Sequence, residues 1–256
     1  MFQIEDTGRV RTLTIASPGR RNAIPSDGWP LLEKAFADFE KSEARVLIVT
    51  GAGGDFCSGA DLDPGQMGGT GIVARQARMR AVGAAALALH KLTKPAVAAV
   101  DGVAVGAGMN LALGCDIVIA STRARFSEIF VRRGLTLDFG GTWLLPRIVG
   151  LQRAKELALT GRIVEAREAV ELGLALEVVD PDRLLDRAME IAMSLQEGAP
   201  IAQMFAKQAL NRSWQLSFEE ALGWEDQSQS ICMGTGDVVE GVASFLQKRP
   251  PEFTGS

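Results

Sequence analysis

Short apolar runs followed by glycine-rich loops constrain the fold of this chain more than any other feature. ARVLIVTG at 44–51 and AVAAVDG at 96–102 are rich in Val and Ala, and each leads into a loop rich in glycine. A third run, IVIAS, lies at 117–121. Short continuous apolar strands are typical of parallel sheets that helices cover on both faces. The sequence therefore predicts an α/β fold.

The order of the remaining patterns predicts one layered body followed by helices. Alternating residues at 9–16 indicate a further strand. Helices are expected at about 26–41, 72–92, 107–113, 200–213, 217–233 and 237–249. One more helix should end at Gly161, and another should begin at Asp180-Pro181. No linker rich in Pro, Gly or Ser divides the chain, so we expect one functional unit.

Composition excludes several classes of protein. The chain has 256 residues, is 47% hydrophobic and 23% charged, and carries a formal net charge of −4. This is an ordinary globular composition, long enough to bury a core without disulfides. The mild negative charge argues against nucleic-acid binding. No segment reaches the ~18 apolar residues of a membrane span. The acidic N-terminus does not resemble a signal peptide, so we expect a cytoplasmic protein that does not bind membranes.

The glycine-rich loops do not match nucleotide-binding motifs. Neither 51–54 nor 106–108 ends in the Gly-Lys-Ser/Thr of a phosphate loop. In the second loop, Leu111 occupies the place of the third glycine of a dinucleotide fingerprint. The single histidine, His90, is expected at the surface or its boundary, which leaves no base for a serine-hydrolase triad. Three scattered cysteines cannot form a zinc cluster with one histidine, so we expect no metal.

Two segments carry a stronger signal, DFCSGADL at 55–62 and DGVAVGAGMNLALGCDIVIA at 101–120. With these in register, the chain resembles the crotonase, or enoyl-CoA hydratase/isomerase, superfamily over nearly its whole length. Further matches are RRNAI at 20–24, LLPRIVG at 144–150 and GDVVEGVASFLQKRPPEF at 236–253. The resemblance implies a spiral core of ββα units at 1–195 and a helical trimerisation region at 196–256. It also implies a homotrimer, or a hexamer formed by two trimers.

The resemblance implies chemistry on an acyl-CoA thioester, with coenzyme A as part of the substrate and no other cofactor. An enolate forms in such reactions, and two main-chain N–H groups can stabilise its oxygen. By position these donors are the amides of Ala60 and Ala107, and Ala107 also opens a helix. Many relatives have glycine at the position of Ala107. Ordinary tight turns are the alternative interpretation of either loop alone.

The residues expected to bind substrate or CoA follow from the same resemblance. They are Arg21 (with Arg20 beside it), Ala60, Asp61, Leu62, Ala107, Phe130, Phe245 and Lys248. Phe245 and Lys248 would reach the nucleotide of a neighbouring subunit. A helix-core phenylalanine and a solvated lysine are the alternative interpretations of these two. Segments such as 63–80 would line the acyl pocket, so acyl length and branching are not predicted.

The two glutamates of hydratases are missing. Their positions hold Asn110 and Phe130, and neither side chain can exchange protons at a useful rate. Simple hydration is therefore disfavoured. Glu128 lies two residues before Phe130, and a helical offset of roughly 200° predicts that it faces away.

Asp138 aligns with the aspartate of isomerase-type members of the superfamily. A double-bond shift needs only one base, which removes a proton from one carbon and returns it to another. Phe130, Phe139 and Trp143 suggest an apolar pocket that would raise the pKa of Asp138. Capping of the following helix is the alternative interpretation of this aspartate. We therefore expect an enoyl-CoA isomerase. A hydratase that uses Asn110 or Glu128 with a positioned water, and a non-catalytic acyl-CoA-binding protein, are the alternatives.

Overall fold

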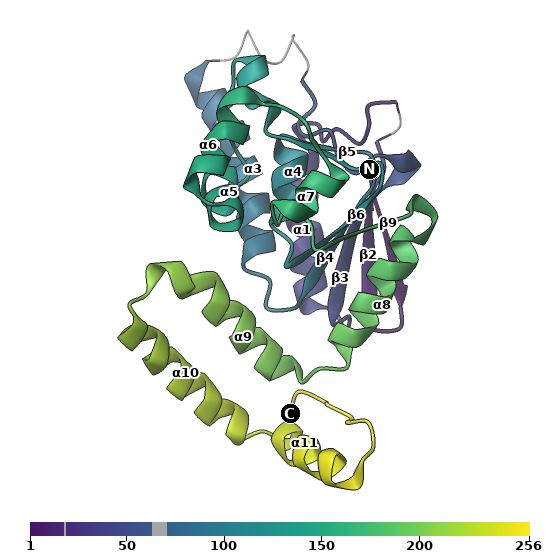
Figure 1. The fold of residues 1–256 in the computed structure, drawn as a ribbon, viewed down its shortest axis with the longest axis vertical. Coiled ribbons are helices and arrows are strands. Elements are labelled where there is room, and N and C mark those ends of the chain that lie inside the picture. Colours follow the sequence, from purple (N-terminus) through teal and green to yellow (C-terminus); the bar gives the residue numbers. More distant parts are fainter. Residues whose placement is uncertain (18, 63–70) are drawn as a thin grey trace.

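The computed structural model describes residues 1–17, 19–62 and 71–256. Within them the chain forms a layered α/β body that ends with helix α8 (Leu184–Gln196). Three further helices extend from this body toward the C-terminus (Figure 1). No helix in these described ranges is long and apolar enough to cross a membrane.

A six-stranded sheet forms the centre of the body. In spatial order its strands are β1 (Phe2–Thr7), β2 (Val10–Ile15), β3 (Val46–Gly51), β4 (Ala96–Val100), β6 (Ile117–Ser121) and β9 (Glu177–Val179). β1 runs antiparallel to β2, and every other neighbouring pair is parallel. The predicted α/β class and the predicted strands are confirmed.

Alternating residues of the central strands bury both faces of this sheet, as the pleat of a strand requires. On β3, Val46 and Ile48 pack in one cluster with Leu184 of α8. Leu47 and Val49 point the other way, into a larger cluster shared with α1 (Gly28–Lys41) and α3 (Ile72–His90). Burial on both sides explains why these strands are continuously apolar.

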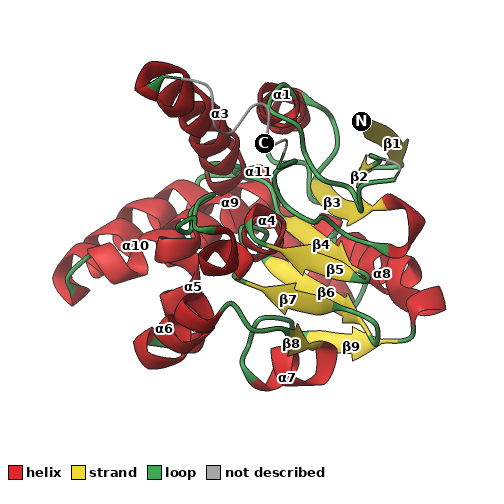
Figure 2. Cartoon of the chain, turned by 90° about the horizontal axis from the view of Figure 1, so that it is seen from above, coloured by secondary structure: helices red, strands yellow, loops and turns green. Residues whose placement is uncertain are grey.

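A second, three-stranded sheet carries the segments that form the candidate site. It contains β5 (Val103–Val105), β7 (Arg125–Ser127) and β8 (Val164–Glu165), and it lies next to the larger sheet (Figure 2). Around it are α4 (Ala107–Leu113), α5 (Gly141–Val149), α6 (Leu151–Thr160), α7 (Ala166–Glu171) and the 3₁₀ helix η2 (Ile129–Arg133). Shorter 3₁₀ turns are η1 (Ala52–Gly54), η3 (Pro181–Arg183) and η4 (Ser213–Gln215).

The C-terminal helices are α9 (Pro200–Arg212), α10 (Phe218–Met233) and α11 (Gly236–Gln247), close to the predicted ranges. Large apolar side chains are exposed on these helices and on η4, among them Trp214 of η4 at 71% and Phe218 and Phe245 at 81% each. Exposed aromatic residues of this size are typical of surfaces that contact a partner. The division at residues 195 and 196 and the assembly of trimers remain predictions.

Strand β1 is a six-residue element that the sequence patterns did not predict. It is an edge strand, and residues 3–7 are all exposed, so only Phe2 packs against the core. The apolar alternation of Phe2 and Ile4 is short, and the polar Asp6 and Thr7 that follow do not continue it.

Candidate active site

The two predicted loops lie side by side because a pair of main-chain hydrogen bonds joins them. The N–H of Cys57 donates to the oxygen of Val103 at 2.8 Å, and the N–H of Val105 donates to the oxygen of Cys57 at 3.1 Å. The backbones approach so closely that a Cβ on Gly108 would lie 2.1 Å from the Cys57 oxygen. Glycine at 108 is therefore required by packing between the loops.

The main-chain pairing of the described loops and helices does not use the amides of Ala60 and Ala107. The main-chain N–H of Ile24 donates to the oxygen of Gly59, and the N–H of Asp61 donates to the oxygen of Ile24, each at 2.8 Å. In this parallel bridge the N–H of Ala60, between the two, points away from Ile24. Ala107 is the first residue of α4 and has no acceptor within its own helix. Neither N–H has an acceptor among the residues that the structure describes.

Two glycines lie where the loops that carry these amides meet. A Cβ on Gly59 would lie 3.4 Å from the nitrogen of Ala107, so the two loops touch at this point. Gly59 has φ +88° and Gly106 has φ +57°, a conformation that L side chains rarely adopt. Glycine at these two positions therefore fixes where each amide points.

Asp138 lies beside α4, in the turn before α5. Its main-chain oxygen accepts from the side-chain amide of Asn110 at 3.0 Å and from the N–H of Gly141 at 2.9 Å. Its side-chain Oδ1 is buried and has no hydrogen-bond partner among the described residues. Burial raises the pKa of Asp138 to about 6. This is the direction expected of the apolar surroundings.

The alternative interpretation of Asp138 as a helix cap is wrong. Helix α5 begins at Gly141, its N-cap residue is Gly140, and no side chain caps it. Phe139 and Gly140 have positive φ angles of 48° and 84°, so the chain turns between Asp138 and the helix. The carboxyl group is thereby left without the amide partners that a cap would supply.

An apolar cavity of about 290 Å³ adjoins this turn. It is lined by Gly83, Ala86, Leu87, His90, Gly114, Phe139, Gly140, Trp143, Leu144 and Gln215. Phe130 and Phe139 are 6% and 3% exposed. Residues 63–70 of the expected acyl-pocket segment lie outside the described residues.

His90 lies at the boundary of the surface, as the sequence suggested. It is half-buried and contacts the ring of Trp143 edge-on, with 5.1 Å between centroids. Burial lowers the pKa of His90, and its ring forms part of the cavity wall. It makes no hydrogen bond to a serine among the described residues.

Glu128 faces the site, and the prediction that it points away is wrong. Glu128 is only 1% exposed, and its side-chain Oε2 lies 3.4 Å from the side-chain amide nitrogen of Asn110. Residues 129–133 form a 3₁₀ helix that begins after Glu128, so the α-helical offset does not apply. Burial raises the pKa of Glu128 to about 8, the Asn110 hydrogen bond lowers it, and the charge of Asp138 raises it further.

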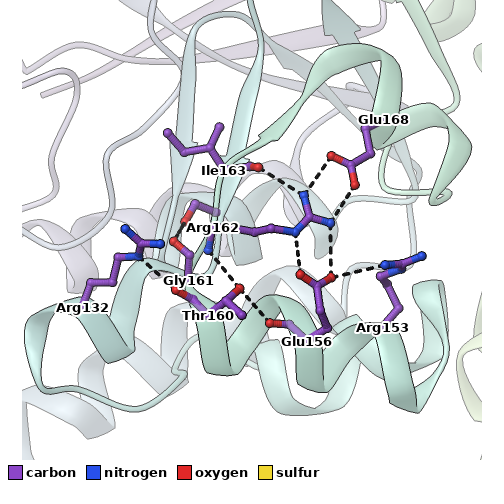
Figure 3. Close-up of polar contacts among 9 residues, drawn as sticks. Arg132, Arg153, Glu156, Thr160, Gly161, Arg162, Ile163 and Glu168 are labelled. Carbon is purple, nitrogen blue, oxygen red and sulfur yellow. Dashed lines mark hydrogen bonds and ion pairs between the residues drawn. The ribbon is translucent and has the colours of Figure 1, made fainter.

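The segment that carries Glu128 is held by the turn after α6 (Figure 3). Ser127 donates its hydroxyl to the oxygen of Gly161 at 3.1 Å, and Arg132 donates Nε to the oxygen of Thr160 at 2.9 Å. Arg162 anchors this turn through hydrogen bonds to Glu156 and Glu168 at 2.5–3.2 Å. This network positions Glu128 although none of its members enters the pocket.

The expected CoA-binding residues near Ala60 lie along one edge. Ser58 donates its N–H to the oxygen of Arg21 at 2.9 Å, which places the two arginines beside the 58–62 segment. Arg20 pairs with Asp61 at 2.5 Å. The side chain of Arg21 is 69% exposed and lies 3.8 Å from Asp55, so much of its charge faces solvent. Leu62 is 41% exposed.

Phe245 and Lys248 lie far from this edge within one chain. Both are exposed, at and just beyond the end of α11, on the side of the molecule opposite α4 and β5 (Figure 1). Their predicted role requires a neighbouring subunit and remains a prediction. Among the described residues, no group of three or more His, Cys, Asp or Glu could hold a metal ion.

Comparison with known proteins identifies the same family. Residues 5–256 match the family model for enoyl-CoA hydratase/isomerase. The chain is 37% identical to the short-chain-enoyl-CoA hydratase of Clostridium acetobutylicum over 97% of its own length and 95% of the relative's. It is 39% identical to the 1,2-epoxyphenylacetyl-CoA isomerase of Escherichia coli over 96% of its own length and 95% of that relative's.

A solved structure confirms the expected fold. The enoyl-CoA hydratase of Bacillus anthracis superposes with a TM-score of 0.94 at 31% sequence identity, covering 100% of this chain and 99% of that one.

Proposed function

This chain belongs to the enoyl-CoA hydratase/isomerase family, and from that premise we propose that it isomerises the double bond of an enoyl-CoA ester. The amides of Ala60 and Ala107 bind the thioester oxygen, and Asp138 moves the proton. The relative at 39% identity is also named an isomerase of a CoA ester, although its named substrate is an epoxide.

The state of Asp138 is the observation that carries the proposal. Its side-chain Oδ1 is buried and has no partner among the described residues, and its pKa is raised to about 6. A base is most effective when its pKa lies near the working pH. Asn110 joins Asp138 to α4, the helix that begins with the Ala107 amide.

The reaction needs no second base. The Asp138 carboxylate takes a proton from C2 of a 3-enoyl thioester, and the electron pair moves into a dienolate whose negative charge rests on the thioester oxygen. The two amides stabilise this charge; loss of one such donor typically costs ~10²–10³ in rate. The protonated Asp138 then returns the proton to C4, which leaves the 2-enoyl product and restores the carboxylate.

In the same proposal, the nucleotide of CoA lies along the Arg20–Arg21 and 60–62 edge. The exposed guanidinium of Arg21 is available to phosphate oxygens. Phe245 and Lys248 of a neighbouring subunit would close over the nucleotide in a trimer or a dimer of trimers. The exposed apolar side chains of α10 and α11 support such an assembly.

The test is a panel of 3-enoyl-CoA esters followed by chromatography of the products. We expect 2-enoyl-CoA from the wild type and a loss of roughly 10²–10⁴-fold in kcat for Asp138→Asn, the range typical of a missing acid–base group. Wild-type-like turnover by Asp138→Asn would remove this residue from the mechanism.

Hydration is the second candidate, because Glu128 shares the pocket and the 37% identical relative is named a hydratase. Two carboxyl groups could activate a water and supply a proton. Feeding 2-enoyl-CoA separates the candidates, since only a hydratase yields the 3-hydroxyacyl ester. Acyl-CoA binding by calorimetry without turnover of either substrate would instead indicate a non-catalytic binding protein.

A further inference from the structure

Three oxygen atoms in the candidate site are buried and lack a hydrogen-bond partner among the described residues. They are Oδ1 of Asn110, Oε1 of Glu128 and Oδ1 of Asp138. The amide nitrogen of Asn110 is already used, since it contacts Glu128 Oε2 at 3.4 Å and the main-chain oxygen of Asp138 at 3.0 Å. With both carboxyl groups ionised, this pocket would hold three acceptors and no free donor.

Such a pocket is unfavourable for two reasons. Buried polar atoms without partners cost free energy, and two neighbouring carboxylates in an apolar site repel each other. A proton on one carboxyl group removes one charge and supplies the missing donor. Glu128 is the better place for it, because this residue is only 1% exposed whereas Asp138 is partly accessible.

Among the residues that the structure describes, no cation compensates for these two carboxyl groups. Helix α4 carries no charged residue. The charged groups on the other elements packed around Glu128 have other partners. Arg125 pairs with Glu165, Arg153 pairs with Glu156, and Arg162 pairs with both Glu156 and Glu168. Arg132, Arg133 and Arg147 donate to the main-chain oxygens of Thr160, Arg132 and Trp143, and Arg147 also stacks on the Trp143 ring. The one charge that acts appreciably on Glu128 is that of Asp138.

We propose that Glu128 is a positioning residue for Asp138: in its protonated form it donates its O–H into the pocket bounded by Asn110 and Asp138, and so holds Asp138 in the ionised form that accepts a proton from the substrate. A single water can carry this hydrogen bond where the two carboxyl groups are not in direct contact. The inference rests on the proposed function, since it takes Asp138 as the base.

This arrangement gives activity a window in pH. Below about 6, Asp138 is protonated and cannot act as a base. Above about 8, Glu128 ionises, the donor is lost, and a second negative charge opposes the developing enolate. The rate is therefore expected to fall on both sides, with the alkaline decline caused by Glu128.

Two substitutions separate this role from a structural one. Glu128→Gln keeps the size and an N–H donor but cannot ionise, so the alkaline decline of kcat should disappear. Glu128→Met removes the donor and should lower kcat by ~10–100-fold at every pH, as loss of a hydrogen bond to a charged group does, with KM changed less than threefold. Glu5→Gln, at an exposed position of β1, is the matched control and should keep the wild-type profile.

A titration without substrate tests the proposal independently of turnover. In folded protein labelled with ¹³C at the glutamate carboxyls, the Glu128 resonance should titrate near 8 and should move to lower pH in Asp138→Asn. The proposal is wrong if Glu128 titrates near 4.5, if Asp138→Asn does not shift it, or if Glu128→Gln keeps the alkaline decline. Absence of turnover with every enoyl-CoA ester would overturn the proposed function, and this titration would still decide the state of Glu128.

Discussion

The side-chain amide of Asn110 donates to the main-chain oxygen of Asp138 at 3.0 Å, and this contact joins helix α4 to the turn that precedes α5. The same amide reaches Glu128. One side chain thus sets the relative positions of both carboxyl groups. The tight fit against Gly141, whose added Cβ would lie 2.4 Å from the Asn110 nitrogen, leaves this amide little freedom.

Replacing Asn110 by alanine should therefore impair turnover more than substrate binding. The variant loses both hydrogen bonds, so we expect kcat to fall by ~10–100-fold with little change in KM. The pKa of Glu128 should rise, because the Asn110 hydrogen bond lowers it in the wild type. Steady-state kinetics and carboxyl titration check this, and an unchanged kcat would contradict it.

A methyl group at Gly108 should separate the two loops. The added Cβ would lie 2.1 Å from the Cys57 oxygen, so the backbone must shift, at a cost of roughly 1–3 kcal/mol or more. Gly223 in α10 is the control, since its Cβ would meet nothing within 4 Å. Gly223→Ala should stabilise by up to about 1 kcal/mol. Urea unfolding measures both changes, and equal effects would contradict the close approach.

Stability should fall as the pH rises from about 4 to 8. Burial raises the folded-state pKa of Asp138 to about 6 and of Glu128 to about 8, above their ordinary values of 3.8 and 4.5. The folded state then binds more protons than the unfolded state in this range. The two carboxyl groups therefore raise the free energy of unfolding at low pH, and this contribution is lost as the pH rises. Asp138→Asn should remove part of this loss.

For Asp138 the difference is on the order of 2–3 kcal/mol between pH 4 and pH 7. Urea unfolding of the wild type and of Asp138→Asn at both pH values measures it. The wild type should lose more unfolding free energy than Asp138→Asn when the pH is raised from 4 to 7. Equal losses in the two proteins would contradict the raised pKa.

Loss of Arg162 should weaken the segment that carries Glu128. Its guanidinium is 29% exposed and bonds two carboxylates, so Arg162→Met is expected to destabilise by about 1–2 kcal/mol and to lower kcat. Arg153→Met is the control, because its side chain is 49% exposed and makes one contact with Glu156 at 3.4 Å. Its effect should stay below about 0.5 kcal/mol. Similar losses in both variants would argue against a positioning role for Arg162.

The two glycine-rich loops of the candidate site could be predicted from sequence because their glycines and small residues recur with family spacing. Gly59, Gly106 and Gly108 are each required by a positive φ or by a close approach. Such constraints act on the identity of one residue and are visible in the sequence. The fold class could be predicted for a similar reason, since burial of β3 and β4 on both faces forces apolar residues along each strand.

The surroundings of Asp138 could not be predicted, because they depend on local backbone geometry. Glu128 points into the pocket since a 3₁₀ helix follows it, and Asp138 misses the helix terminus since Phe139 takes a positive φ. Neither conformation has a residue pattern of its own. A glutamate two positions before Phe130 was the signal available in the sequence. The assumption of α-helical geometry led to the wrong direction for its side chain.

The position of Cys57 makes the contact between the two loops measurable. Its side chain is fully buried where the loops join, and burial raises the pKa of its thiol to about 12. An alkylating reagent can therefore reach this sulfur only while the loops are apart. The rate at which Cys57 is modified in the native protein therefore reports how often the two loops separate.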